Sequence, residues 1–365
     1  MSDPVTAVPT AAVAAWGLAT AHRLPTSPLD DSAFTELVTS CRQQRVLGLL
    51  GAAVADGSFP TTDPQRLELD RGWQEWLGHA VRAEQLALRV RDVLTADGIP
   101  VRVLKGLALA HTAYPDPALR VHGDVDLLVP HDRLHRAGMV LVETLDGIRA
   151  EPEVRAGFDD RFGREVMVRA SGVEIDLHRT LVNGAYGVRI PLPSLLEDPQ
   201  SITVGGGTLE VLPAVPRLLH AAYQSTLADW PPRLVAFRDL AQVLVHDAPE
   251  LDALLDTARA WRGTAVLAAG VRAAWRGLRV TTRPPLVDWA ERHHAPAYDR
   301  LLITAARGRA RGYTAGVTTL LAVPGVRDRA AYLRAVLAPS PEYRTARGLG
   351  SFALVGSGTR RARRG

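Results

Sequence analysis

The sequence predicts an α+β protein in which a small mixed sheet is flanked by helical regions on both sides. Apolar residues recur at helical spacing before residue 97 and again after residue 213. Between these regions, short β-branched or alternating runs are separated by turn residues, which is typical of strands. We therefore expect a helical N-terminal region at 1–97, a sheet domain at 98–212, a helical C-terminal domain at 213–345 and a flexible basic tail at 346–365.

Composition indicates a soluble globular protein of more than one domain. The chain has 365 residues, 47% of them hydrophobic, with a net charge of +4 and a pI near 9.5. Cys41 is the only cysteine, which excludes an intrachain disulfide and favours a reducing, cytoplasmic compartment. We expect no signal peptide and no membrane span, because no run of about 18 uninterrupted apolar residues occurs.

Lysine usage is unusual, because Lys105 is the only lysine among 43 basic residues. Abundant Ala, Arg, Gly and Pro indicate a GC-rich, bacterial genome, in which lysine codons drift to arginine. A site that needs a compact ammonium group does not tolerate that exchange. Lys105 is therefore a candidate for chemistry, and the alternative is an accidental survivor on the surface.

The elements follow from the period of the apolar residues. The hairpin is predicted from two alternating runs around Gly172, and Gly205-Gly206-Gly207 reads as a turn because it lacks the spacing of a phosphate-binding loop. In order, we expect helices at 34–41 and 83–96, a strand at 99–104, a helix at 107–113, a strand at 124–129, a helix at 132–142, hairpin strands at 165–169 and 173–178, and helices at 218–223, 234–244, 250–275, 285–309 and 327–337.

Acidic residues alternate along two of these strands. Successive side chains of a strand point to opposite faces, so Asp124 and Asp126 share one face, about 6–7 Å apart. On the strand at 173–178, the shared polar face carries Glu174, Asp176 and His178. If the two strands are neighbours, up to four carboxylates face one another and need a cation or protonation. Oxygen ligands of this kind favour Mg²⁺ or Mn²⁺.

Groups suited to phosphate lie near these acids in the sequence. Lys105-Gly106 is at a strand-to-helix junction, where a glycine admits close approach and a helix N-terminus favours an anion. Arg120 precedes Asp124 by four residues and could bind phosphate oxygens in a bidentate manner. Metal ions that bridge carboxylates and a triphosphate are what two-metal nucleotidyl transfer requires.

Two segments, residues 103–130 (VLKGLALAHTAYPDPALRVHGDVDLLVP) and 173–181 (VEIDLHRTL), resemble the uncharacterised nucleotidyltransferase family of the polymerase-β-like superfamily. The resemblance extends over about residues 85–245. It implies that Asp124 and Asp126 are the metal ligands of a D-x-D strand and that Asp176 is the third acid. Lys105-Gly106 takes the place of the superfamily's usual Gly-Ser pair. The 17 residues between Gly106 and Asp124 are more than is usual there.

Several assignments keep an alternative. Geometry permits Glu174 in place of Asp176 as the third acid, and His178 could bind phosphate or be a structural histidine. His220 is either a packing residue or part of the site, and Arg238 with Asp239 could form a structural ion pair. The complete expected sets are Asp124, Asp126 and Asp176 for catalysis and metal binding, and Lys105, Gly106, Arg120, Gly123 and His178 for cofactor binding.

The expected activity is transfer of a nucleoside monophosphate, AMP from ATP, to a hydroxyl group with release of pyrophosphate. The cofactor would be Mg²⁺ or Mn²⁺, and the acceptor a small molecule, a peptide or a protein. Arginines without interleaved aromatic residues give no clear nucleic-acid groove. The alternatives are a nucleotide-binding regulatory protein without turnover and a metal-dependent phosphohydrolase, which His122 near Asp124 keeps open.

Overall fold

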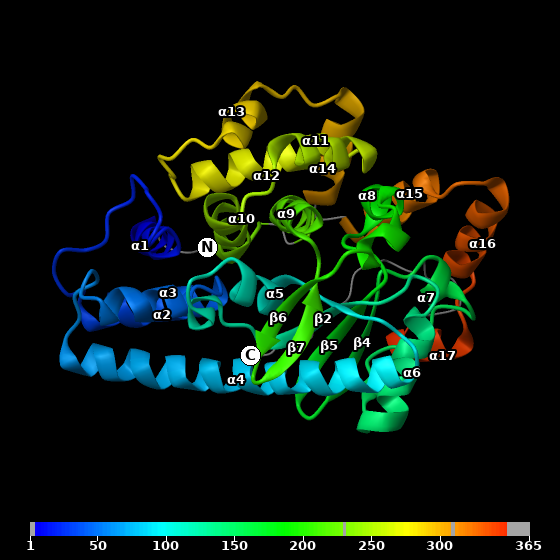
Figure 1. Cartoon of the computed structure of the whole chain (residues 1–365), viewed down its shortest axis with the longest axis horizontal. Helices are drawn as coiled ribbons and strands as arrows, with labels where there is room; N and C mark the ends of the chain where they lie inside the picture. The colour runs from blue at the N-terminus through cyan, green and yellow to red at the C-terminus, as the bar shows by residue number, and fades with distance from the viewer. Residues whose placement is uncertain (1–3, 229–230, 308–310, 349–365) are drawn as a thin grey trace.

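A seven-stranded mixed sheet lies at the centre of the α+β fold, with its strands in the order β3-β4-β5-β2-β1-β7-β6 (Figure 1). The computed structural model describes residues 4–228, 231–307 and 311–348. In the middle of the sheet β2 and β5 run parallel, and β4 and β5 form the predicted antiparallel hairpin. The strands are β1 (Arg102–Val103), β2 (Asp124–Leu128), β3 (Ile148–Arg149), β4 (Glu165–Ala170), β5 (Val173–His178), β6 (Gln200–Val204) and β7 (Gly207–Val211).

One face of the sheet is apolar and packs against two helices. Val125 and Leu127 of β2 and Ile175 and Leu177 of β5 are fully buried there. This face is covered by α4 (Asp63–Ala96) and α6 (Leu134–Leu145), which both contact β5. Because side chains alternate along a strand, the acidic residues of β2 and β5 are directed to the opposite face.

Helix α4 joins the sheet to the N-terminal helices and extends well beyond the predicted 83–96. Thr62 caps its start in a capping box with Gln65, and Gly98 (φ 71°) follows its end in the left-handed conformation that favours glycine. Its second half, from Ala83 to Leu94, packs on the sheet. Its first half, including Leu69, packs with the N-terminal helices.

The helices on either side of the sheet domain in sequence share one hydrophobic core. Phe34 and Leu50 of the N-terminal region are buried in the same cluster as Leu218, Leu244 and Val271. In Figure 1, α9 to α14 lie above the sheet and α1 to α3 lie beside them. These helices are α1 (Pro4–Ala14), α2 (Asp31–Gln43), α3 (Leu47–Ala55), α9 (Ala214–Tyr223), α10 (Leu234–His246), α11 (Leu251–Ala260), α12 (Thr264–Gly277), α13 (Pro285–Arg292) and α14 (Ala297–Arg307).

Two further predicted helical segments are each divided into two helices in the structure. The segment expected at 250–275 is interrupted before Thr264, and its two parts are α11 and α12. The segment expected at 285–309 is interrupted between Arg292 and Ala297, around Pro296, and its two parts are α13 and α14. Proline and glycine cause these breaks, because proline restricts the residue before it and glycine disfavours helix continuation. The strand expected at 99–104 is formed only at Arg102–Val103.

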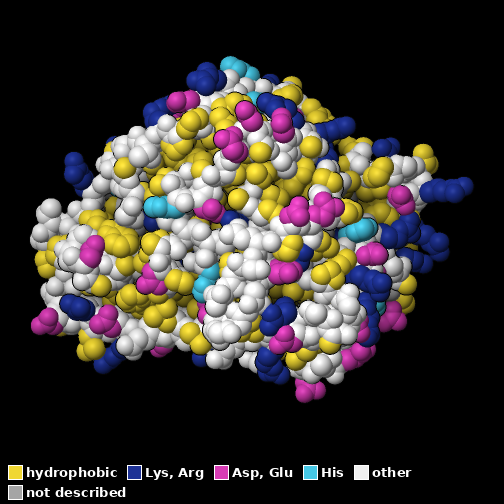
Figure 2. Space-filling model, in the orientation of Figure 1, with side chains coloured by type: hydrophobic (Ala, Val, Ile, Leu, Met, Phe, Trp, Pro, Cys, Tyr) yellow, Lys and Arg dark blue, Asp and Glu magenta, His cyan; other side chains and the backbone are white. Residues whose placement is uncertain are grey.

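The last helices of the described chain pack beside the sheet domain. Helix α15 (Arg311–Ala322) lies on α8 (Gly184–Arg189), while α16 (Val326–Leu337) and α17 (Pro341–Arg347) lie near α7 (Phe158–Arg161). On the face shown in Figure 2, acidic and basic side chains are interspersed, and basic ones gather at the edge where α16 lies. Most of the expected basic tail, from 349 onward, lies outside the described residues.

None of the helices that the structure describes is both long and apolar enough to span a membrane. The remaining short elements are α5 (Lys105–Thr112), the 3-10 helices η1 (Pro117–Arg120) and η2 (Leu192–Leu196), and the π-helical turn η3 (Gln224–Ala228).

Candidate active site

The parallel pairing of β2 and β5 brings the predicted acids together. In this register Asp124 lies beside Glu174, and Asp126 lies beside Asp176. Neighbouring strands are about 4.8 Å apart, so the four carboxyl groups share one small region of the polar face. Asp126 and Asp176 are only 5% and 8% exposed, whereas Asp124 and Glu174 are half-buried. The strand neighbours on which the predicted acid cluster depends are therefore present.

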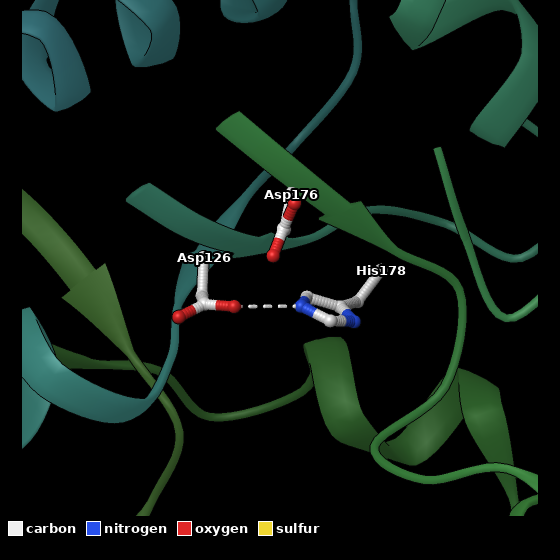
Figure 3. Close-up of side chains that lie close together, drawn as sticks. All are labelled: Asp126, Asp176 and His178. Atoms are coloured by element: carbon white, nitrogen blue, oxygen red, sulfur yellow. Dashed lines mark hydrogen bonds and ion pairs between the residues drawn. The ribbon is translucent and has the colours of Figure 1, made fainter. Parts of the chain in front are cut away.

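Asp126, Asp176 and His178 form the buried centre of this cluster (Figure 3). His178 Nε2 donates a hydrogen bond to Asp126 Oδ1 at 2.9 Å. One ligand atom from each of the three residues lies within 4.8 Å of the other two. Asp176 Oδ1 is buried and has no hydrogen-bond partner among the described residues. A buried carboxylate oxygen without a donor is costly, so this position suits a cation.

The two buried aspartates differ in their electrostatic surroundings. Burial, and then the charges of Asp126 and Glu165, raise the pKa of Asp176 to about 8. Burial also acts to raise the pKa of Asp126, but Lys105 and His178 outweigh it and hold that pKa well below its usual range. The cluster therefore carries a firm negative charge on Asp126, whereas at Asp176 the attraction of Lys105 does not offset burial and the repulsion of the neighbouring acids.

Lys105 supplies the positive charge on Asp126. Its Nζ lies 2.5 Å from Asp126 Oδ1 and 3.2 Å from His178 Nε2. Burial lowers the pKa of Lys105, but the nearby Asp126 carboxylate more than offsets this, so the ammonium form is retained. The backbone of Lys105 is in the left-handed region (φ 49°), which costs a residue with a side chain about 1–3 kcal/mol.

Gly106 follows Lys105 at the start of α5. A Cβ atom at this position would lie 2.8 Å from His122 Cβ, closer than real contacts permit, so only glycine fits without a shift. The first N–H groups of α5 have no partners within the helix and carry its positive dipole end. Gly123, in contrast, has no atom within 4 Å of where a Cβ would be, which leaves space before Asp124.

Arg120 lies apart from the carboxylate cluster, in a buried ion pair with Asp239 of α10. Its Nε and one terminal nitrogen donate to the two Asp239 oxygens at 2.7 and 2.9 Å, and Tyr114 Oη donates to the same carboxylate at 2.8 Å. Of the alternatives for Arg238 and Asp239, the ion pair between them is not the one formed, because Asp239 pairs with Arg120. Arg238 donates instead to Gln242 Oε1 and to backbone carbonyl groups of the N-terminal region.

Three charged residues of the cluster were not anticipated. An Arg45 terminal nitrogen lies 3.3 Å from Asp124 Oδ2, and Arg164 pairs with Glu165, whose Oε2 lies 3.4 Å from His178 Nδ1. Glu165 begins one strand of the predicted hairpin, and the observed register of that hairpin pairs it with His178. Nothing in the local sequence around Arg45, at the end of an N-terminal helix, points to this contact.

A family model described as an uncharacterised nucleotidyltransferase matches residues 30–276. This chain belongs to that family. Its nucleotidyltransferase activity follows from this membership, and the match covers every acid of the cluster as well as Arg45. A comparison with curated proteins finds no match.

Two solved structures are similar to parts of this nucleotidyltransferase. The crystal structure of ANT(2'')-Ia in complex with adenylyl-2''-tobramycin is 14% identical, with a TM-score of 0.34, and the match covers 49% of this chain and 96% of that chain. An antigenic nucleotidyltransferase-like protein from Paracoccidioides brasiliensis is also 14% identical, with a TM-score of 0.32 and coverage of 57% and 95%.

Two cavities of the nucleotidyltransferase meet at the acids. The smaller cavity, of about 320 Å³, is lined by Lys105, Gly106, Asp126 and Asp176, and also by His220 and Gln224 of the helices above the sheet. Burial and the charge of Lys105 lower the pKa of His220 to about 3, so this histidine is neutral. Gln224 Nε2 lies 3.0 Å from His220 Nε2.

The larger cavity, of about 710 Å³, shares Asp124, Glu165 and Glu174 with the smaller one. Its far wall carries aromatic side chains, and Tyr332 of α16 stacks on Phe158 with ring centroids 6.1 Å apart. Each arginine that lines it has an acidic partner within 4 Å. These pairs are Arg45–Asp124, Arg149–Asp159, Arg164–Glu165, Arg169–Glu174 and Arg347–Glu151.

Proposed function

We propose that this nucleotidyltransferase transfers a nucleoside monophosphate, AMP from ATP, to a hydroxyl group and releases pyrophosphate. The observation that carries the proposal is the register in which Asp126 lies beside Asp176, with Asp124 on the same face. The carboxyl groups of Asp126 and Asp176 converge there, and Asp176 has a buried oxygen without a donor among the described residues. Such a set is unfavourable unless the site takes up positive charge, which metal-bound nucleotide would supply.

Asp124, Asp126 and Asp176 would hold Mg²⁺ or Mn²⁺. Asp126 and Asp176 belong to the close set with His178, Asp124 lies on the same face of β2, and the unpartnered Oδ1 of Asp176 fits a divalent cation. When bound, the metal supplies charge stabilisation at the phosphate oxygens and acidifies the acceptor hydroxyl. His178 fixes the orientation of Asp126 through its 2.9 Å hydrogen bond. The other carboxylate oxygen of Asp176 would accept the proton of the attacking hydroxyl.

We assign the nucleotide to the smaller cavity, because Lys105 and the start of α5 border it. The ammonium group and the N–H groups of the helix N-terminus are suited to the β- and γ-phosphates and the departing pyrophosphate. Arg120 would add a positive potential at this cavity, while its direct hydrogen bonds remain with Asp239. Gly123 leaves room beside the first acid.

The acceptor hydroxyl would enter from the larger cavity. Its volume of about 710 Å³ is in the range typical of small-molecule sites, about 300–1,000 Å³. Because each of its arginines is already paired with an acid, the cavity offers little net positive charge to a polyanion. This supports a small molecule, or a side chain of a peptide or protein, rather than a nucleic acid.

Incubation with α-labelled NTPs, Mg²⁺ or Mn²⁺ and a cell extract tests the proposal. Label in an acceptor, strongest with ATP, is the expected result, whereas acceptor-independent release of labelled NMP would indicate a phosphohydrolase. We expect Asp126→Asn to lower transfer by at least about 100-fold while leaving the circular dichroism spectrum unchanged. Asp256→Asn, a change at an exposed surface acid, is the matched control. Normal turnover by the Asp126 variant would refute the metal-site assignment.

The hydrolase alternative rested on His122 near Asp124. His122 is 2% exposed and lines neither of the two cavities at the acids. Burial and the adjacent Arg120 lower the pKa of His122 to about 4, so it is neutral. A histidine enclosed away from both cavities is poorly placed to serve as a metal ligand or as the base for an attacking water.

A further inference from the structure

The ammonium group of Lys105 contacts the carboxylate of Asp126, which a divalent cation at this site would also need. Its Nζ is 2.5 Å from Asp126 Oδ1, the oxygen that also belongs to the candidate metal-binding set of Asp126, Asp176 and His178. A metal ion and an ammonium group cannot both bind that oxygen at full strength. The left-handed backbone of Lys105 places a side chain where glycine would be the favourable residue. The strained backbone of Lys105 therefore holds its ammonium group beside the acidic side chains.

The charges of the cluster are balanced pair by pair, with one exception. Arg45 lies on Asp124, Lys105 on Asp126 and Arg164 on Glu165, and each of these three carboxylates thus has a cation from a different segment. Asp176 has no cation within the ion-pair distance among the described residues. A divalent ion between Asp126 and Asp176 would bring two positive charges to a cluster that lacks only one.

We infer that Lys105 is the counter-ion of Asp126 in the metal-free enzyme, and that metal binding displaces its ammonium group toward the phosphates of the nucleotide. The inference rests on the proposed function, since it requires a metal on Asp126 and a triphosphate beside α5. The excess positive charge that the metal creates is relieved when Lys105 leaves Asp126. The smaller cavity, which Lys105 and Gly106 line, is the space into which the side chain moves.

Two consequences follow from this exchange. Lys105 competes with the metal when no nucleotide is present, and it assists the nucleotide once the metal is bound. Metal and nucleotide therefore bind with positive cooperativity, and by linkage each raises the affinity of the other by the same factor. Removal of the lysine charge should tighten metal binding and weaken nucleotide binding, two effects of opposite sign. A lysine that only binds phosphate would produce the second effect without the first.

The only lysine of the chain allows a direct test in the unaltered protein. Protein labelled with ¹³Cε-lysine gives one Cε–Hε signal, that of Lys105. We expect Mg²⁺ alone to shift this signal and a non-hydrolysable ATP analogue to shift it again. Mn²⁺ binding is measured in parallel by electron paramagnetic resonance. If Mn²⁺ binds and Mg²⁺ leaves the lysine signal in place, the exchange does not occur. If no metal binds, the proposed function fails as well.

A charge-removing variant provides the thermodynamic counterpart. Lys105→Met should bind Mn²⁺ about tenfold more tightly than the wild type without nucleotide, and bind the Mn²⁺–ATP analogue less tightly. Arg136→Met, which removes a surface charge paired with Asp97, should change neither affinity. Equal or weaker Mn²⁺ binding by Lys105→Met would overturn the inference. The NMR titration of the wild-type protein decides the question if that variant does not fold.

Discussion

Replacing Asp176 with asparagine is expected to stabilise the metal-free enzyme and to abolish nucleotidyl transfer. The side chain is 8% exposed, its Oδ1 has no hydrogen-bond partner among the described residues, and the charges of Asp126 and Glu165 lie nearby. A carboxylate in such a place opposes folding until a cation arrives. An amide of nearly the same shape is neutral at every pH, so the variant avoids the cost of either burying the charge or protonating the carboxyl group on folding.

The pKa of Asp176 gives the magnitude. Burial and the neighbouring acids raise this pKa from 3.8 in the unfolded chain to about 8 in the folded protein. Between these values the folded protein binds more protons than the unfolded chain, so its stability falls as the pH rises from about 4 to 8. At pH 7, roughly three pH units at about 1.36 kcal/mol each correspond to about 4 kcal/mol. The unpaired amide of asparagine offsets part of this, and we expect a net gain of about 2 kcal/mol.

Thermal unfolding in EDTA from pH 5 to pH 9 measures this effect. A gain of about 2 kcal/mol raises Tm by roughly 3 °C at pH 7, and the two proteins should converge near pH 5. Mg²⁺ should raise the Tm of the wild type and leave that of Asp176→Asn nearly unchanged. A lower Tm for the variant at every pH, or the same pH dependence in both proteins, would refute the reasoning.

Further changes test other parts of the structure. Asp239→Ala and Arg120→Met each break a buried ion pair and should destabilise the protein by about 3–5 kcal/mol in urea unfolding, with the double variant costing less than the sum; additive costs would contradict the pairing. Val336→Trp partly fills the larger cavity and should lower acceptor transfer at least tenfold without changing nucleotide affinity, whereas an equal loss of both would contradict the division into two cavities. Gly106→Ala forces a Cβ against His122 and should weaken ATP binding about tenfold in calorimetry, and unchanged binding would show that α5 does not contact phosphate.

The centre of the sheet could be predicted because its information is local. Alternation along β2 and β5 identifies the faces that carry Asp126 and Asp176, and the apolar partners Val125 and Ile175 identify the covered side. Gly172 marks the turn between β4 and β5, and the observed register of this hairpin places Glu165 beside His178. Strand periodicity is thus sufficient to anticipate the neighbourhood of the acids, although it does not choose between Asp176 and Glu174.

Partners that are distant in sequence could not be predicted in this way. The guanidinium group of Arg120 can form two hydrogen bonds at once, and its place near the acids in the sequence suggested a phosphate ligand. In the structure both bonds go to Asp239 of α10. The docking of α10 against η1 determines that Arg120 binds Asp239, and the local sequence carries no sign of this contact. Likewise, the aromatic wall that Tyr332 contributes to the larger cavity depends on α16 packing near Phe158, and neither segment carries a local sign of the other.

The division of the chain at residue 97 places Arg45 in the N-terminal helical region and its partner Asp124 in the sheet domain. The ion pair between them crosses that division at 3.3 Å, directly at an acid proposed to bind metal. Helix α4 ends just before this division, yet Leu69 lies in the helical core and Val90 lies in the core of the sheet domain. Because one cation of the cluster, Arg45, comes from the N-terminal helical region, that region contributes directly to the charge of the site. The docking of this region places Arg45 beside Asp124, so Asp124 has this counter-ion only when both parts are folded together.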